Sequence, residues 1–246
     1  MTIASPTARN AGRSARSAFF PAMAVFIVVI AFIGFSKTFF LPLLGRTFTA
    51  PVIIWVHAGL MFSWVFLFLT QALFISTGNF NWHRRAGIVG AILATLIVPF
   101  TIATGVAILP RDIANMGEAA YSAFLPTIIE ALLFGSLVAA AITLRSRPDY
   151  HKRLMLLATL SALGPAWFRF RHFFPQVDNP IVVFAFWLAI VPMLFAALWD
   201  GWRNGRMHPV FLTVLPAMLA IYVVEVWGSG HPWFLATAKY AAGLLN

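Results

Sequence analysis

The feature that most constrains this chain is a succession of apolar runs, each about 20 residues long, separated by short segments that hold most of its charges. Such a run is the length at which an α-helix crosses the roughly 30 Å hydrocarbon core of a bilayer. Of the 246 residues, 61% are hydrophobic and 10% are charged, whereas a soluble domain carries about 25% charged residues. The sequence therefore predicts an all-α membrane helix bundle surrounded by lipid.

Seven apolar runs predict seven membrane-spanning helices in a single domain over residues 19–246. Residues 1–18 contain Arg9, Arg13 and Arg16 and no acidic residue, which is typical of a basic cytoplasmic tail. The predicted spans cover residues 19–36, 51–74, 85–109, 123–144, 154–172, 181–199 and 209–227.

The distribution of Lys and Arg predicts the orientation of the bundle. With the N-terminus inside, 11 of the 17 basic residues fall on the cytoplasmic side, as the positive-inside rule requires. We therefore expect a multi-pass protein of the bacterial inner (cytoplasmic) membrane, with its N-terminus inside and its C-terminus outside. Topology explains the net charge of +10, so nucleic acid is not expected as a partner. The absence of cysteine excludes disulfides and thiolate metal sites.

The six histidines fall into two layers in this topology. The starts of three spans place His83, His151 and His208 near the inner surface, and His57, His172 and His231 lie toward the outer surface. Ionisable side chains at membrane depth usually face the bundle interior and often mark functional sites. Each layer is therefore a candidate site.

A b-type haem is the first ligand that these histidines suggest. It would lie between His57 and His172 in the outer layer, or between His83 and His151 in the inner layer, where Arg84 and Arg85 would neutralise its propionates. Structural roles stay open as alternatives. The His57 ring suits an interhelical hydrogen bond, and the inner histidines suit interfacial anchors of helix ends.

A zinc or iron ion is the competing ligand. His83, His151 and His208, together with Asp200 at the end of the sixth predicted span, would supply three nitrogens and one oxygen. Around a bound water, these ligands would suit a metal-dependent membrane hydrolase. Seven-span hydrolases of that kind usually show two histidines one turn apart on the last helix, whereas position 212 is Leu.

Two acidic residues lie within apolar runs. Glu130, well inside the fourth predicted span, suits proton transfer in an outer cavity, and pairing with Arg169 or Arg171 is the structural alternative. Glu225 lies close to the outer end of the last predicted span, where direct hydration is expected.

Four short motifs lie at helix starts or within spans: WVHAG at 55–59, HRRAG at 83–87, HKRLM at 151–155 and GRMHP at 205–209. With these motifs the chain resembles a family of uncharacterised bacterial multispan membrane proteins. The resemblance implies a multispan architecture and carries no activity. The chain is also loosely similar to membrane b-type cytochromes, whose helices present histidines in two layers, although it lacks their paired mid-helix histidines.

Three functions remain open from the sequence. The first is a redox protein that holds a histidine-bound haem and exchanges electrons with a quinone. The second is the metal-dependent hydrolase, and the third is a non-catalytic subunit or assembly factor of a membrane complex. Transport is a further alternative, for which Gly164-Pro165 is the best candidate for a helix break.

Overall fold

The structure, a computed structural model, describes residues 6–245, with side chains from residue 18 onward. The described part of the chain is helical and contains no strand. The elements, in chain order, are α1 (Pro6–Phe35), η1 (Ser36–Phe40), α2 (Leu41–Leu44), α3 (Val52–Ser76), α4 (Phe80–Met116), α5 (Ala119–Thr143), α6 (Pro148–Ser161), α7 (Gly164–Phe168), η2 (Arg169–His172), η3 (Ile181–Trp187), α8 (Leu188–Asn204), α9 (Pro209–Gly228) and α10 (Pro232–Leu245).

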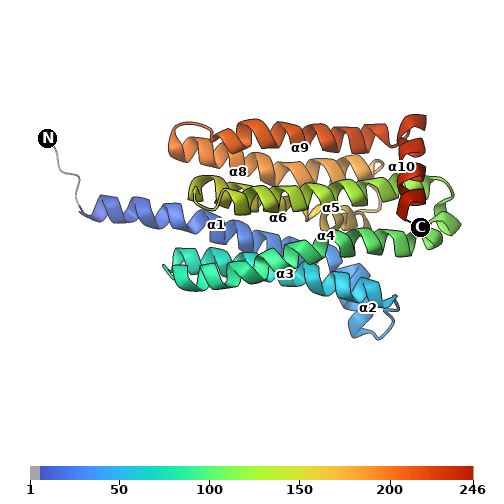
Figure 1. The fold of residues 1–246 in the computed structure, drawn as a ribbon, viewed down its shortest axis with the longest axis horizontal. Helices are drawn as coiled ribbons and strands as arrows, with labels where there is room; N and C mark the ends of the chain where they lie inside the picture. The colour runs from blue at the N-terminus through green and yellow to red at the C-terminus, as the bar shows by residue number, and fades with distance from the viewer. Residues whose placement is uncertain (1–5, 246) are drawn as a thin grey trace.

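The long helices lie side by side along one common direction (Figure 1). The chain enters at one end of this bundle, the N-terminal end, where the turns that join α3 to α4, α5 to α6 and α8 to α9 also lie. It finishes at the opposite end, the far end, which carries α2, the turn from α4 to α5, and α10. The two ends of the described chain therefore lie at opposite ends of the bundle.

Among residues 6–245, six helices are long and apolar enough to cross a membrane, which confirms a multi-pass membrane bundle. They cover Ala18–Leu44, Val52–Ser76, Phe80–Met116, Ala119–Thr143, Ile181–Asn204 and Pro209–Gly228. Their outward faces carry large exposed apolar side chains such as Ile88 and Leu198, as expected for helices in contact with lipid. The described residues thus contain six candidate spans, whereas seven were predicted.

The segment that departs from the prediction is residues 154–172, predicted as the fifth span. There α6 ends at Ser161, and the chain turns before the short α7 and the 3-10 segment η2. At 1.5 Å per residue, the 14 residues of α6 reach only about 21 Å. Pro165 lies in the first turn of α7 and has no backbone N–H, so it cannot continue the hydrogen bonds of α6.

The broken segment also has an unusual environment for a predicted span. Leu156, Leu157 and Leu160 are at most 1% exposed, and the segment packs against α1, α5, α8 and α9. Protein, rather than lipid, therefore surrounds this apolar run. Hydropathy does not distinguish these two environments, because both favour apolar side chains.

Two further differences concern helix ends. The helix α4 begins at Phe80 and ends at Met116, beyond both ends of the predicted 85–109, so Arg84 and Arg85 lie within the helix. The helix α10 was not predicted. It lies across the far end of the bundle (Figure 1) and buries Phe234, Ala238 and Ala242. Of the basic tail predicted over residues 1–18, residues 1–5 lie outside the described residues, and the backbone from Pro6 onward is helical and belongs to α1.

Candidate functional site

Two of the predicted site histidines meet at the N-terminal end of the bundle. His83 is the fourth residue of α4, and His151 is the fourth residue of α6. Their ring centres lie 6.2 Å apart, and the ring planes are nearly perpendicular at 85°. We call these two residues the histidine pair. The structure thus brings together one of the two pairs that the sequence left as alternatives.

A backbone carbonyl orients one ring of the histidine pair. The Nδ1 atom of His151 lies 2.8 Å from the carbonyl oxygen of Ala141, near the end of α5. Because a carbonyl oxygen only accepts hydrogen bonds, Nδ1 is the donor, and in the neutral ring Nε2 keeps a free lone pair. Metal-binding histidines in proteins commonly have this arrangement.

The surroundings of the histidine pair contain further unsatisfied polar atoms. Both Nδ1 of His83 and Oε1 of Gln71 are buried without a hydrogen-bond partner. Gly87 lies one turn after His83, and the space beside it is open. A Cβ at Gly87 would approach only the Gln71 amide nitrogen, at 3.7 Å. Buried polar atoms usually have hydrogen-bond partners, so these two atoms are available to bind a further group.

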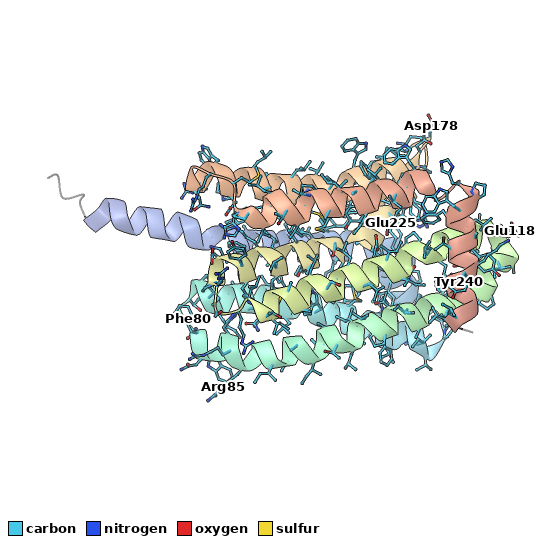
Figure 2. All side chains as sticks on the ribbon, turned by 45° about the horizontal axis from the view of Figure 1, so that its top comes forward. Phe80, Arg85, Glu118, Asp178, Glu225 and Tyr240 are labelled. Carbon is cyan, nitrogen blue, oxygen red and sulfur yellow. The ribbon has the colours of Figure 1, made fainter. Side chains whose placement is uncertain are left out.

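The two arginines beside His83 are exposed at the edge of the bundle. Arg84 donates to Oδ1 of Asn81 at 2.6 Å, and the Arg85 guanidinium lies 5.6 Å from the centre of the Trp82 ring. Figure 2 shows Arg85 at this edge, near Phe80. Both guanidinium groups therefore have neutral partners.

The four residues proposed as zinc or iron ligands do not converge. Nε2 of His208 lies 3.0 Å from Oδ2 of Asp149, and the carboxylate of Asp200 forms a buried ion pair with Arg153. Asp200 also accepts a hydrogen bond from Asn204 at 3.0 Å. Within residues 6–245, no three His, Cys, Asp or Glu side chains form a group that could hold a metal ion. The geometry thus gives no support to the hydrolase hypothesis.

The sequence did not predict the ion pairs that Arg153 and Asp149 form. Arg153 lies in the HKRLM motif at 151–155, beside a helix start, and is only 4% exposed. The partners lie 47 and 59 residues apart in the chain, and no spacing pattern links residues on non-consecutive helices.

The outer histidines take separate partners. Nδ1 of His57, on α3, lies 3.4 Å from Oγ1 of Thr101 on α4, which is the interhelical hydrogen bond weighed as its structural role. The His172 ring is exposed, and its backbone carbonyl accepts a hydrogen bond from Lys37. The ring contacts found among the described residues do not join His57 to His172.

A second candidate site lies in the far half of the bundle, where α7 begins. Glu130 on α5 and Glu225 and Tyr222 on α9 lie within electrostatic range of one another. We call these three residues the carboxyl cluster. Figure 2 shows Glu225 among the helices toward the far end. Only 7% of Glu225 and 2% of Tyr222 is exposed, so the expected hydration of Glu225 is wrong.

Several polar atoms in and beside the carboxyl cluster lack a hydrogen-bond partner among the described residues. Neither Oε1 of Glu225 nor the Tyr222 hydroxyl has a hydrogen-bond partner, and the indole nitrogen of Trp167 on α7 lacks one as well. A Cβ on Gly164 would lie 3.0 Å from Oε1 of Glu130, so the glycine is what allows this carboxyl group to approach the start of α7.

The expected pairing of Glu130 with Arg169 or Arg171 is not found. The ion pairs formed within the described chain include neither arginine. Arg169 instead donates to the Pro165 carbonyl at 2.8 Å and to Oγ1 of Thr38 at 3.1 Å. Glu130 therefore lies beside a helix break without a cationic partner among the described residues.

The chain matches no protein-family model, no curated protein and no solved structure.

Proposed function

We propose that this chain is a membrane redox protein that holds one b-type haem between His83 and His151 and exchanges electrons with a quinone. The observation that supports the proposal is the 6.2 Å separation of the two ring centres. A metal bound at about 2 Å by one nitrogen of each imidazole places the ring centres roughly 6 Å apart. A quinone is the proposed partner because it dissolves in the hydrocarbon around the helices.

The residues around the histidine pair fit such a group. The Ala141 carbonyl holds His151 in the tautomer whose Nε2 can bind a metal. The ion pairs found among the described residues include neither Arg84 nor Arg85, so their charges are available to the two propionates. A bound haem supplies one-electron chemistry, and the chain's own residues hold it and orient it.

The first experiment is a visible spectrum of the protein purified in mild detergent from cells supplied with haem, oxidised and then reduced with dithionite. We expect a Soret band and sharpened bands on reduction, with about one haem per chain. Metal analysis on the same sample reports iron or zinc bound in any other way. A protein without haem after adequate supply would overturn the proposal.

Variants locate the haem. His83→Ala and His151→Ala should each lose the haem spectrum, because each removes one of the two residues that would hold the haem. His57→Ala, in the opposite half of the bundle, is the matched control and should keep it. If the spectrum survives in both His83→Ala and His151→Ala, the assignment to the histidine pair is wrong.

We further propose that Glu130 and Glu225 form a proton-transfer site that opens toward the far face. The close approach of Glu130 to Gly164 at the break before α7 favours this second activity. Two carboxyl groups at membrane depth without a cation do not both ionise readily, because each charge opposes the other in a low dielectric. The Tyr222 hydroxyl lies within electrostatic range of both carboxyl groups and has no hydrogen-bond partner among the described residues.

Infrared difference spectra recorded across a pH titration test the proton site. The wild type should show a carboxylic C=O band that disappears on ionisation and is lost in both Glu130→Gln and Glu225→Gln. Glu118→Gln is the control, since Glu118 is exposed at the same end and pairs with Lys239. A band unchanged in both cluster variants would contradict the proposal.

A further inference from the structure

A group of basic side chains gathers at the far end of the bundle from two segments that are distant in the chain. Lys37 lies in η1, and Arg169, Arg171 and His172 form most of η2. We call these four residues the cation cluster. Lys37 donates to the carbonyl oxygen of His172 at 2.8 Å, and Nε of Arg169 donates to Oγ1 of Thr38 at 3.1 Å. These bonds hold the two segments together.

Every contact found for these cations is with a neutral group. Lys37 lies 4.5 Å from the centre of the Phe173 ring. Arg169 lies over Phe35 at 4.2 Å, and Arg171 lies over Phe168 at 3.9 Å. The remaining bonds go to backbone carbonyls, from Arg169 to Pro165 and from Arg171 to Phe168.

No carboxylate compensates the cation cluster within the described chain. The four ion pairs formed there belong to Arg111, Arg153, Lys239 and His208. The nearest acid in the sequence, Asp178, lies at the outer edge of the bundle in Figure 2 and forms none of these ion pairs. Three permanent cations are thus held together without a counter-charge.

The cations are close enough to affect one another. Burial, and then the charges of the other members of the cluster, hold the pKa of His172 below its usual value. Repulsion of this kind is unfavourable unless an anion enters. Arg169 and Arg171 are half-buried, so solvent screens their charges less than those of fully exposed side chains.

We propose that the cation cluster is a binding site for a phosphate group, carried either by a phospholipid headgroup or by a small soluble molecule. The donors left over support this chemistry. Arg169 uses only Nε and Nη1, Arg171 uses only Nη1, and a guanidinium has five N–H donors in a planar fork that suits phosphate. Lys37 is exposed and keeps two of its three donors.

The site is separate from the proposed haem site. The histidine pair lies at the N-terminal end, at the starts of α4 and α6, and the cation cluster lies at the far end (Figure 1). Binding of phosphate therefore does not depend on whether a haem is present, and the two proposals fail independently.

The test has two arms, both with the full chain in non-ionic detergent after removal of co-purified lipid. Inorganic phosphate is titrated and binding followed by calorimetry, and phosphatidylglycerol is added and its retention measured by native mass spectrometry. Binding of phosphate indicates a soluble ligand, and retention of phosphatidylglycerol alone indicates a lipid headgroup. If the wild type binds neither probe, the proposal is overturned.

Variants connect the binding to the cluster. Lys37→Gln and Arg171→Gln should each weaken binding about tenfold or more, because each removes a charge-assisted hydrogen bond. Arg111→Gln is the matched control, since it removes an exposed charge at the same end that already pairs with Asp112 at 2.7 Å. Lys37 is exposed, so its replacement leaves the packing intact. Equal affinity in both variants and the wild type would overturn the proposal.

Discussion

His208 shows how one side chain can connect two helix starts. Its Nδ1 accepts a hydrogen bond from the Val210 backbone N–H at 3.2 Å, which satisfies a free donor in the first turn of α9. In the neutral ring the proton is therefore on Nε2, which donates to Asp149 at 3.0 Å. The edge of the same ring packs on Tyr150, 4.6 Å between ring centres. The start of α9 is thus attached to the start of α6.

This contact predicts a dependence of stability on pH. The hydrogen bond from His208 is the main cause that lowers the pKa of Asp149. The unfolded chain, with an Asp pKa of about 3.9, then binds protons more readily than the folded one. The contribution is complete above that value and is lost as the pH falls through the folded pKa.

Asp149→Asn should therefore lose less stability than the wild type when the pH is lowered from about 5 to 3. Because Asp149 is exposed, the difference should be small. Unfolding temperatures in detergent measure it, with Asp178→Asn as the control for an exposed acid that forms no ion pair found in the structure. A wild-type acid profile in Asp149→Asn would show that the contact contributes nothing.

At the scale of the helices, α1 approaches α7 closely just after the break that follows α6. Gly34 of α1 lies against the backbone of Ala166 in α7, and a Cβ on Gly34 would lie 2.8 Å from the Ala166 carbonyl carbon. Small residues allow membrane helices to pack at such short distances. The backbone of α7 cannot move aside as a flexible side chain can.

Gly34→Ala should accordingly destabilise the protein by about 1–3 kcal/mol, the usual cost of overpacking. Gly59→Ala is the matched control, because it also lies inside a long helix and a Cβ there meets nothing within 4 Å. That variant should be neutral or up to about 1 kcal/mol more stable, because alanine has the higher helix propensity. Equal unfolding temperatures for the two variants would contradict the proposed close contact.

At the scale of the molecule, the chain lacks cysteine, so single cysteines can report on topology. Asn81 lies at the start of α4, at the N-terminal end, and Glu118 follows its C-terminal end. Asn81→Cys and Glu118→Cys should react with a membrane-impermeant thiol reagent from opposite sides of the membrane. The proposed orientation places Asn81 inside. Labelling of both from one side would exclude α4 as a membrane span.

The membrane environment of this protein, its helical class and most of its span positions follow from the sequence alone. Lipid cannot hydrogen-bond to the backbone, so an apolar run of sufficient length must be helical. The predicted last span, 209–227, differs from α9 by only one residue at its end.

Which side chains meet depends on how the helices pack in three dimensions. Sequence spacing leaves open how each helix is rotated and which helices are neighbours. For that reason, the pairing of His83 with His151, the burial of Glu225 and the contact of Arg153 with Asp200 were not determined by the sequence. The fifth predicted span is the clearest case. Its apolar run was predicted to face lipid, but protein surrounds α6, and Pro165 ends its hydrogen-bond ladder.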